Sequence, residues 1–415
     1  MDYYEIDTST EKALLVCVDT GDFDADASVD ELTLLAESAG AEVMGKIIQR
    51  KGTPDGATYL GSGKLSEAEN FCHSQEIDLI ICDGELTPSQ IRNIENATKV
   101  KVIDRTQLIL DIFALRAKTK EGKLQVELAQ MKYALPRLTG KGKELSRLGG
   151  GIGTRGPGES KLESDRRHIM RRIHALEEQL NEVEKRRAIL RKRREKNEIT
   201  TVALVGYTNA GKSTLMNALT DAGVLAEDKL FATLDPTARK LTLPNGQDVM
   251  LIDTVGFVSR LPHDLVKAFK STLEEAANAD IILNVCDASD GKCTDHVEIT
   301  TDILRDLGCV SDNIITVMNK CDKAENIFNL LTFNKTVMIS ALKGINLDLL
   351  LKEIEKCLKE TTVEIQLLIP FSKGADVNVI RNTGKILSEE YTENGTLLKV
   401  ILSTKDLDKF ENYTV

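Results

Sequence analysis

The chain has 415 residues, of which 41% are hydrophobic and 29% charged, and its formal net charge is −11. This length predicts two to four domains, and the composition is ordinary for a protein with buried cores. No apolar stretch approaches the roughly 18 residues of a membrane-spanning helix, and the start carries no basic and apolar signal segment. We therefore expect a cytoplasmic monomer without a transmembrane segment. This expectation allows peripheral contact with a membrane.

The cysteines and histidines show no metal-binding pattern. The eight cysteines form no Cys-x-x-Cys pair, and the five histidines have no spacing typical of metal ligands. Scattered cysteines of this kind are typical of buried thiols in a reducing compartment. We expect no structural metal held by Cys and His.

The first 112 residues alternate strand and helix patterns. Apolar runs predict strands at 13–18, 43–48, 79–82 and 102–103, with helices near 30–38, 66–75 and 89–99. The helix start at 87–90 is the clearest, because Thr-Pro-Ser-Gln combines a cap, a first-turn proline and a glutamine at the third position. This alternation predicts a small N-terminal α/β domain.

One short run in this domain looks like part of a phosphate loop. Gly61-Ser62-Gly63-Lys64 has the glycine and lysine of such a loop. However, Thr58 stands where the first glycine is needed, and Leu65 stands where the hydroxyl is needed. We interpret the run as a structural loop, with a second nucleotide site as the alternative.

The middle of the chain is basic. Residues 116–196 carry 23 Lys and Arg against 11 Asp and Glu, a net charge of +12 that leaves −23 on the rest. A strongly positive segment on an acidic protein points to a polyanionic partner. We expect that partner to be RNA and not DNA.

An amphipathic helix explains much of this basic segment. Apolar residues recur at three- and four-residue steps, at Ile169, Ile173, Leu176, Leu180, Val183 and Leu190. A shorter series, Leu128, Met131 and Leu135, predicts an antiparallel partner helix across the glycine-rich run 149–158. The predicted RNA contacts are Arg155, Lys185, Arg186, Arg187, Arg191, Lys192, Arg193 and Arg194. The alternatives are that the cations only form a solvated helix face and that the glycine-rich run is a plain linker.

The most informative run of the chain is the octet 206–213, Gly-Tyr-Thr-Asn-Ala-Gly-Lys-Ser. It follows an apolar stretch at 201–205 and precedes a helical pattern at 214–219, so it reads as strand, tight loop and helix start. Such a loop gathers backbone N–H groups and a helix N-terminus around a polyphosphate. Lys212 would supply charge to the β and γ phosphates, and Ser213 a hydroxyl to Mg²⁺. The predicted contacts are Gly206, Tyr207, Thr208, Asn209, Ala210, Gly211, Lys212 and Ser213.

Two later segments are predicted to respond to Mg²⁺ and the γ-phosphate. Asp253 ends the apolar strand 249–252, where its carboxylate can reach the magnesium shell. Gly256 offers a backbone N–H to the γ-phosphate, whose loss would release the following segment. In the preceding loop, 227–239, Thr233 and Thr237 are both candidate magnesium ligands. Further predicted nucleotide contacts are Phe231, Ala232, Leu234, Asp235, Thr254 and Val255.

The base is predicted to be guanine. Asp322, after the apolar strand 314–318, can accept two hydrogen bonds from the ring N–H and exocyclic amine of guanine, which adenine does not offer. A carboxylate left without these partners is costly, so such a site discriminates strongly. The predicted contacts are Asn319, Lys320, Cys321 and Asp322, with Ser340, Ala341 and Leu342 after the strand 336–339.

Three runs together show a family resemblance. They are Phe231-Ala232-Thr233-Leu234-Asp235, Asp253-Thr254-Val255-Gly256-Phe257 and the glycine-rich run 149–159. On these residues the chain resembles the HflX-type GTPases, ribosome-associated members of the translation-factor-related P-loop class. The resemblance implies Thr233 as the magnesium threonine, and the large ribosomal subunit with its RNA as the partner.

Phe257 occupies an unusual position for a GTPase. Ras-like enzymes have a glutamine there that orients the attacking water, and a phenylalanine cannot do so by hydrogen bonding. We therefore expect slow hydrolysis by the protein alone, with the water-positioning group supplied by the mobile loop or by a partner. The alternative is that Phe257 is a core residue beside another side chain that acts unaided. The sequence assigns no catalytic base.

The expected fold class is α/β, with four parts. They are an N-terminal α/β domain at 1–112, a basic helical hairpin with a glycine-rich loop at 113–198, a P-loop GTPase domain at 199–361 and a small C-terminal β/α domain at 362–415. The GTPase domain is expected to have a mixed sheet with helices on both faces and a last helix near 347–359. The C-terminal part shows strand, helix and strand patterns at 364–369, 375–388 and 396–403.

Three functions are consistent with the sequence. The favoured one is a GTP-hydrolysing switch, with Mg²⁺ as cofactor, that binds the large ribosomal subunit and acts in ribosome dissociation, rescue or assembly. The second is a GTPase that regulates a non-ribosomal protein. The third, an ATP-driven RNA remodeller, depends on the incomplete run at 61–64.

Overall fold

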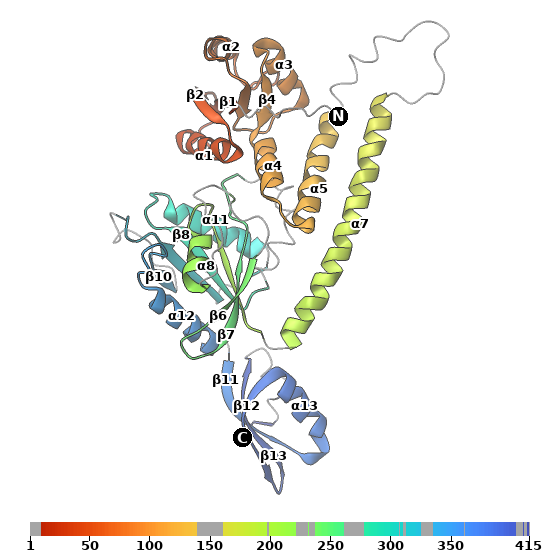
Figure 1. The fold of residues 1–415 in the computed structure, drawn as a ribbon, viewed down its shortest axis with the longest axis vertical. Helices are drawn as coiled ribbons and strands as arrows, with labels where there is room; N and C mark the ends of the chain where they lie inside the picture. The colour runs from red at the N-terminus through yellow and green to blue at the C-terminus, as the bar shows by residue number, and fades with distance from the viewer. Residues whose placement is uncertain are drawn as a thin grey trace, which may run out of the picture. The chain divides into compact units, whose positions relative to one another are not determined.

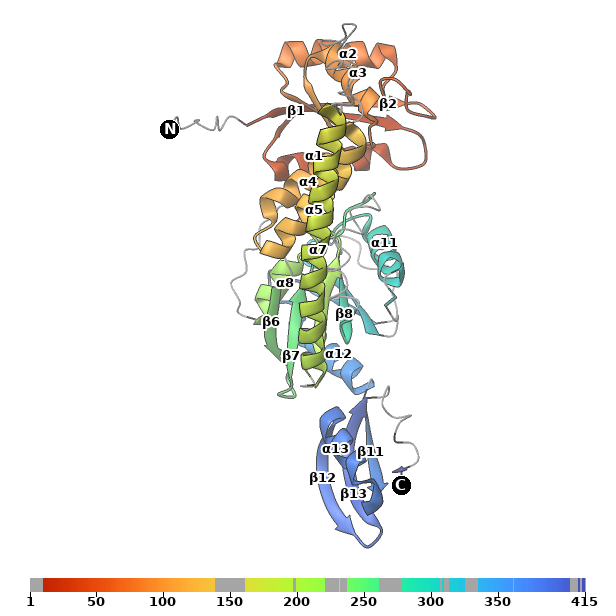
Figure 2. The same cartoon turned by 90° about the vertical axis from the view of Figure 1, so that its right-hand side faces the viewer.

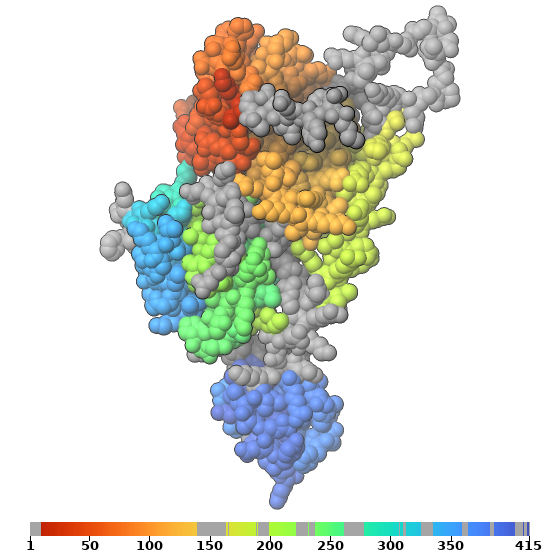
Figure 3. Space-filling model, viewed as in Figure 1, coloured from red at the N-terminus to blue at the C-terminus, as the bar shows by residue number. Residues whose placement is uncertain are grey.

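The computed structural model describes most of the chain. The described residues are 10–138, 161–196, 199–220, 231, 237–260, 278–306, 308–309, 313–324, 335–360, 362–403, 410 and 413–414. Figures 1 and 3 show them coloured from red at the N-terminus to blue at the C-terminus, and they belong to two compact units. One unit comprises residues 1–183, 227–235 and 258–270, and the other comprises 184–226, 236–257 and 271–415.

The first unit begins with a four-stranded parallel sheet in the order β2-β1-β3-β4. The strands are β1 (Lys12–Asp19), β2 (Glu42–Arg50), β3 (Leu79–Cys82) and β4 (Lys101–Asp104). The helices that connect them are α1 (Ala25–Ala39), α2 (Ser62–Gln75) and α3 (Pro88–Thr98). β1 and β3 are buried on both faces, which explains their uninterrupted apolar sequence. The predicted α/β alternation is confirmed.

Local sequence signals start two of these helices. The Thr87 hydroxyl accepts from the N–H of Gln90 while the Gln90 side chain accepts from the N–H of Thr87, so the predicted capping box is present. The Asp24 side chain caps α1, which therefore begins five residues before the predicted 30–38. The run 61–64 is not a loop, because Gly61 caps α2 and Ser62 to Lys64 form its first turn. That part of the prediction was wrong.

The helices α4, α5 and α7 follow the sheet domain. α4 (Arg105–Arg116) begins directly after β4 and was not predicted, since its run of buried apolar residues has no polar face to reveal a helical period. α5 (Lys120–Arg137) and α7 (Lys161–Lys196) then run side by side in opposite directions (Figures 1 and 2). Their shared core contains Leu124, Leu128, Met131, Leu135, Ile169, Ile173, Leu176 and Leu180. The predicted antiparallel hairpin is confirmed.

The second unit contains a six-stranded mixed sheet in the order β10-β9-β8-β5-β7-β6, with only β6 antiparallel to its neighbour. The strands are β5 (Thr201–Gly206), β6 (Thr237–Thr242), β7 (Asp248–Asp253), β8 (Ile281–Asp287), β9 (Ile314–Asn319) and β10 (Thr336–Met338). α8 (Lys212–Thr220) and α12 (Leu347–Glu360) share one core with the sheet, and α11 (Cys293–Asp306) forms another. This is the expected mixed sheet with helices on both faces.

The chain ends in a three-stranded antiparallel sheet with the order β11-β13-β12. Its elements are β11 (Thr362–Ile369), a short 3₁₀ turn (Phe371–Lys373), α13 (Gly374–Thr383), β12 (Gly384–Thr392) and β13 (Gly395–Ser403). The helix predicted at 375–388 was too long, because residues from Gly384 onward pair with β13. The hairpin turns at Gly395, whose φ of +146° favours glycine.

Cys286 and Cys293 lie side by side with their sulfur atoms in contact. The free cysteines are Cys17, Cys72, Cys82, Cys309, Cys321 and Cys357. Within the described ranges, no three His, Cys, Asp or Glu side chains gather as a metal site. No helix in those ranges is long and apolar enough to cross a membrane. The predicted division into four domains at 1–112, 113–198, 199–361 and 362–415 stays a prediction.

Candidate functional site

Four predicted motifs of the second unit lie at one edge of its sheet. β5 pairs in parallel with β7 and β8, β9 pairs in parallel with β8, and β10 pairs in parallel with β9. The carboxyl ends of these strands therefore point the same way, and the segments 206–213, 253–257, 319–322 and 340–342 follow them. Ligands of open α/β sheets bind at this edge.

Lys212 is enclosed by its own loop. Its ammonium group donates to the carbonyl oxygens of Gly206, at 3.0 Å, and Tyr207, at 2.8 Å. Burial lowers the pKa of Lys212 to about 8, while the negative charge of Asp253 acts in the opposite direction. An ammonium with so little solvent around it is suited to bind phosphate oxygens.

Ser213 and Asp253 provide a pair of oxygen donors. The Ser213 hydroxyl donates to Asp253 Oδ2 at 2.9 Å, and Asp253 is fully buried at the end of β7. A hydroxyl and a carboxylate this close fit a hard divalent cation such as Mg²⁺, which prefers oxygen ligands. Ser213 and Asp253 therefore fit the predicted magnesium site.

Asn319 ties three loops together. Its side-chain amide donates to the carbonyl oxygen of Ala210 at 2.8 Å, and its side-chain oxygen accepts from the N–H of Ala341 at 2.9 Å. Gly211 makes this approach possible, because a Cβ there would lie 2.3 Å from Asn319 Nδ2, and its φ is +89°. Asn319 thus holds the predicted base loops against the predicted phosphate loop.

Asp322 is held in its ionised form. Hydrogen bonds from Ser340 and Lys343 lower its pKa, and Lys343 Nζ lies 3.1 Å from Asp322 Oδ2. Lys320 Nζ pairs with Asp287 Oδ2 at 2.7 Å. A charged carboxylate beside the loop 340–342 can accept hydrogen bonds from a base.

The sequence interpretation did not include Lys343 or Asp287. Asp287 ends β8 at the same edge of the sheet as the motifs, and Lys343 lies three residues after Ser340. Their positions after strands were the only available signals. Tyr207 and His296 were also missed as a pair, and their rings stack with centroids 3.8 Å apart. His296 lies on α11, 89 positions along the chain, so no local pattern relates the two.

Phe257 is a core residue whose backbone contacts the phosphate loop. Its ring is 3% exposed. Its N–H donates to the carbonyl oxygen of Gly206 at 3.1 Å, and its carbonyl oxygen accepts from the N–H of Thr208 at 2.7 Å. At Gly256 a Cβ would lie 2.9 Å from Lys212 Nζ, so glycine allows the backbone to pass close to the ammonium. A buried ring fits both interpretations of Phe257, and the source of the group that orients the water stays a prediction.

The predicted loop 231–235 is described only at Phe231. Its ring is buried and meets Phe113 of α4 edge-on, with centroids 4.6 Å apart, inside the first unit. Ala232, Thr233, Leu234 and Asp235 lie outside the described residues. Thr237, the other candidate threonine, is the first residue of β6 and pairs with Asp253 across the sheet. The choice between the two threonines stays a prediction.

Seven of the eight predicted RNA contacts belong to α7, part of whose surface is visible in Figure 3. Lys185 and Arg186 are exposed, and Arg187 is half-buried. Arg191, Lys192, Arg193 and Arg194 belong to the end of α7, but their side chains lie outside the described part of the chain. Arg155 and the glycine-rich run 149–158 also lie outside it.

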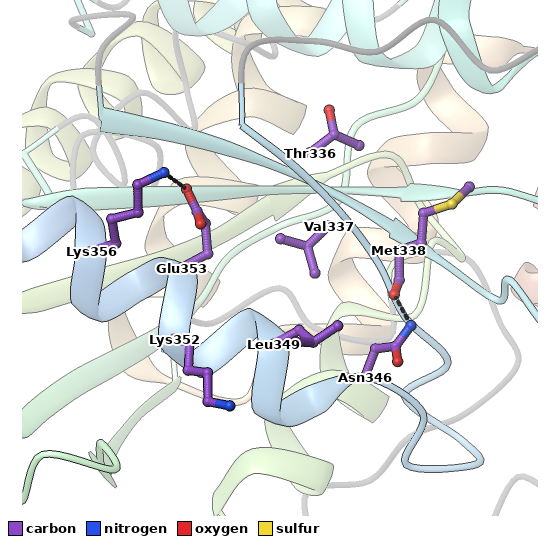
Figure 4. Close-up of a pocket in the computed structure, with 8 residues that line it drawn as sticks. All are labelled: Thr336, Val337, Met338, Asn346, Leu349, Lys352, Glu353 and Lys356. Atoms are coloured by element: carbon purple, nitrogen blue, oxygen red, sulfur yellow. Dashed lines mark hydrogen bonds and ion pairs between the residues drawn. The ribbon is translucent and has the colours of Figure 1, made fainter.

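A hollow of about 430 Å³ lies between β10 and α12 (Figure 4). Three of its polar side chains have partners: Lys356 pairs with Glu353 at 3.4 Å, and Asn346 donates to the carbonyl oxygen of Met338 at 2.9 Å. The lining residues are Thr336, Val337, Met338, Asn346, Leu349, Lys352, Glu353 and Lys356. None of them belongs to a predicted nucleotide motif, so we assign this hollow no ligand.

Comparison with protein families matches three consecutive stretches of the chain. The family described as "GTP-binding GTPase N-terminal" matches residues 26–114, and "GTP-binding GTPase Middle Region" matches 116–194. The family described as "50S ribosome-binding GTPase" matches 201–320. The last of these contains the octet 206–213, the segment 253–257 and Asn319 with Lys320.

Individual relatives extend the similarity over nearly the whole chain. A protein named GTPase HflX from Caldanaerobacter subterraneus subsp. tengcongensis is 50% identical over 411 residues, which cover 99% of this chain and 95% of the relative. The GTPase HflX of Escherichia coli K12 is 44% identical over 317 residues, 76% of this chain and 74% of the relative. A solved GTP-binding protein from Sulfolobus solfataricus, in complex with GDP, is 28% identical with a TM-score of 0.47, covering 85% of this chain and 99% of that one.

Proposed function

Because this chain belongs to the HflX family of GTPases and so binds and hydrolyses GTP, we propose that it is a nucleotide switch for the large ribosomal subunit. In this proposal the GTP form binds the subunit, and hydrolysis ends the association. The process served would be ribosome dissociation, rescue or assembly. Two features support the proposal: the match of residues 201–320 to a family described as ribosome-binding, and the basic helix α7.

We propose roles for the residues of the sheet edge. Lys212 would bind the β and γ phosphates, Asn319 would keep the base loops and phosphate loop together, and Asp322 would select guanine. The backbone N–H of Gly256, in a buried and closely packed segment, would donate to the γ-phosphate, and loss of that phosphate would release the segment. Ser213 and Thr233 would hold Mg²⁺. Asp253 would accept hydrogen bonds from the Ser213 hydroxyl and from water molecules bound to the ion. When bound, the ion would neutralise charge that develops on the phosphates.

The buried Phe257 supports the proposal that hydrolysis is slow without a partner. The position after Gly256 contributes no hydrogen bond to water, since its side chain is an enclosed ring. The group that orients the attacking water would therefore come from the loop 227–239 or from the ribosome. We propose that the large subunit completes this geometry and so stimulates hydrolysis.

Charge on α7 supports RNA as the contacted surface. Exposed cations at Lys185 and Arg186 lie on the same helix as the basic run 191–194. The hydrophobic side of α7 is already packed against α5, so the basic side needs no protein neighbour for burial. Phosphate groups of ribosomal RNA fit such a surface.

Sedimentation with ribosomal subunits tests the proposal. The full chain is mixed with large subunits under GTP, a non-hydrolysable GTP analogue or GDP, and the bound fraction is measured at increasing salt. We expect tight binding with the analogue, weak binding with GDP and a steep loss of affinity with salt. Equal binding in all three nucleotide states, or no binding, would favour a GTPase that regulates a non-ribosomal protein.

A further inference from the structure

The strand order of the first unit singles out one position at the carboxyl edge of its sheet. In the order β2-β1-β3-β4, β2 lies on one side of β1, and β3 and β4 lie on the other, so the direction in which strands are added reverses between β1 and β3. Sheets of this kind bind ligands in the crevice where that reversal occurs. Asp83 lies there, directly after β3, and its side chain is fully buried.

A segment of the same chain occupies this position. The described residues 258–260 belong to the first unit, and Arg260 reaches the Asp83 carboxylate. Its Nη1 lies 2.7 Å from Asp83 Oδ2 and 3.2 Å from Ser28 Oγ. Its guanidinium carbon lies 4.2 Å from the centre of the Phe23 ring. A carboxylate, a hydroxyl and an aromatic face are the groups that recognise a guanidinium.

The neighbouring residue is held as firmly. The N–H of Ser259 donates to Glu31 Oε1 at 3.2 Å, and the Ser259 hydroxyl donates to the other oxygen of Glu31. The carbonyl oxygen of Ser259 accepts from Arg105 Nη2 at 3.2 Å. Backbone and side chain of Ser259 are therefore both bound, which is more than a single surface ion pair provides.

The charges of the cluster balance only when Arg260 is present. Asp83 and Glu31 carry two negative charges, and Arg105, which is 3% exposed, supplies one positive charge. Burial opposes ionisation of Asp83, but the charges of Arg105 and Arg260 outweigh it and hold the pKa of Asp83 below its ordinary value. A buried acidic site with one negative charge in excess attracts a cation.

The occupant is directly connected to the nucleotide site. Arg260 follows Gly256 by four positions, and Phe257 between them is bonded through its backbone to Gly206 and Thr208. Arg260 also has a φ of +55°, a left-handed conformation that a non-glycine residue adopts only when its surroundings stabilise it. The contacts with Asp83 and Ser28 provide that stabilisation.

We propose that Asp83, Ser28 and Phe23 form a guanidinium-binding site for Arg260, and that this docking strengthens the binding of GTP relative to GDP. In GTPases the γ-phosphate orders the segment that follows Gly256, and ordering costs entropy. A segment already ordered by docking pays less of that cost when GTP binds, whereas GDP makes no contact with it. Linkage requires the reverse effect as well, so GTP strengthens the docking.

The central experiment uses Arg260→Gln in the full chain. We expect the ratio of the GDP dissociation constant to that of a non-hydrolysable GTP analogue to fall by about fivefold, at the low end of coupling between sites. The matched control is Arg50→Gln, which removes an exposed arginine of the same unit that pairs with Asp19 at 3.1 Å. Its ratio should equal that of the parent. No ribosome is present, so the result is independent of the proposed ribosomal role.

Two further measurements separate docking from a general effect on the fold. Asp83→Asn would weaken the ion pair with Arg105, whose Nη1 lies 2.7 Å from Asp83 Oδ1. Ser28→Ala removes only a longer contact with Arg105, at 3.5 Å, so it is the better second variant, and we expect a smaller shift in the same direction. Hydrogen exchange of the amides in α1 should be slower with the GTP analogue than with GDP in the parent, and this difference should vanish in Arg260→Gln. An unchanged ratio in Arg260→Gln, or an equal shift in Arg50→Gln, would overturn the proposal.

Discussion

Replacing Asn319 with alanine should weaken GTP binding strongly. The side chain is 3% exposed and bonds to the carbonyl oxygen of Ala210 at 2.8 Å and the N–H of Ala341 at 2.9 Å. The variant leaves both backbone groups without this partner, and each such change costs about 1–3 kcal/mol. Because the two groups lie in loops that must be ordered together around the nucleotide, we expect about 2–3 kcal/mol to appear in affinity, a reduction of roughly 30- to 150-fold.

Isothermal titration with GDP and with a non-hydrolysable GTP analogue measures this reduction. The matched control is Asn346→Ala, which removes another side-chain bond to a backbone carbonyl, at 2.9 Å, within the same unit. Asn346 has a φ of +58°, so its replacement also strains the backbone and should destabilise the fold at least as much. Its nucleotide affinity should nevertheless stay near that of the parent.

The two nucleotides should be affected alike, because Asn319 holds loops that serve the base and the β-phosphate as well as the γ-phosphate. Affinity within about threefold of the parent for Asn319→Ala would refute the reasoning, since the expected cost is larger. An equal reduction in Asn346→Ala would refute it too, because the effect would then come from general destabilisation.

Other predictions follow from the same site and from the basic helix. Asp322→Asn should weaken guanine nucleotides and favour xanthine nucleotides, because an amide would donate where the carboxylate accepts; competition between the two bases measures this. Lys212, with its pKa of about 8, should be charged below pH 8 both with and without nucleotide. Above pH 8 the free protein has lost this proton and must take it up again when nucleotide binds, so affinity should fall as pH rises from 8 towards the ordinary pKa of 10.5. Titration in buffers of different ionisation enthalpy detects that proton. Replacing all four cations at 191–194 with glutamine should leave GTP binding unchanged and weaken ribosome binding, and the salt dependence should become shallower by about 0.7–0.9 in slope for each replaced cation that binds a phosphate. Because Phe257 cannot orient water, turnover should be slow alone and rise by about 10²- to 10⁵-fold with the large subunit, and fast turnover that ribosomes leave unaltered would contradict this.

The sequence by itself determined the local features of the protein. The octet 206–213 had to follow a strand and begin a helix, because its glycines, lysine and serine suit only that turn. The apolar spacing of α5 and α7 determined which sides meet, and the Thr87 and Gln90 pair determined where α3 begins. These features depend on residues within a few turns of one another, so their period and spacing can be read along the chain.

Local pattern failed where the surroundings decided the structure. α4 is buried around most of its surface and so lacks a polar face. The strand β12 exists because its residues pair with β13 beyond the turn at Gly395, although their sequence continued the pattern of α13. In both cases tertiary contacts override local propensity.

Only the tertiary structure determined which distant residues meet. Strand order placed Asn319 against Ala210, 109 positions away, and Asp287 beside Lys320. Packing stacked Tyr207 on His296 and brought Arg260 to Asp83 across 177 positions. No spacing along the chain encodes such pairs, because their approach is decided by the order of strands in the sheet and by the burial of charge, which the whole fold sets at once.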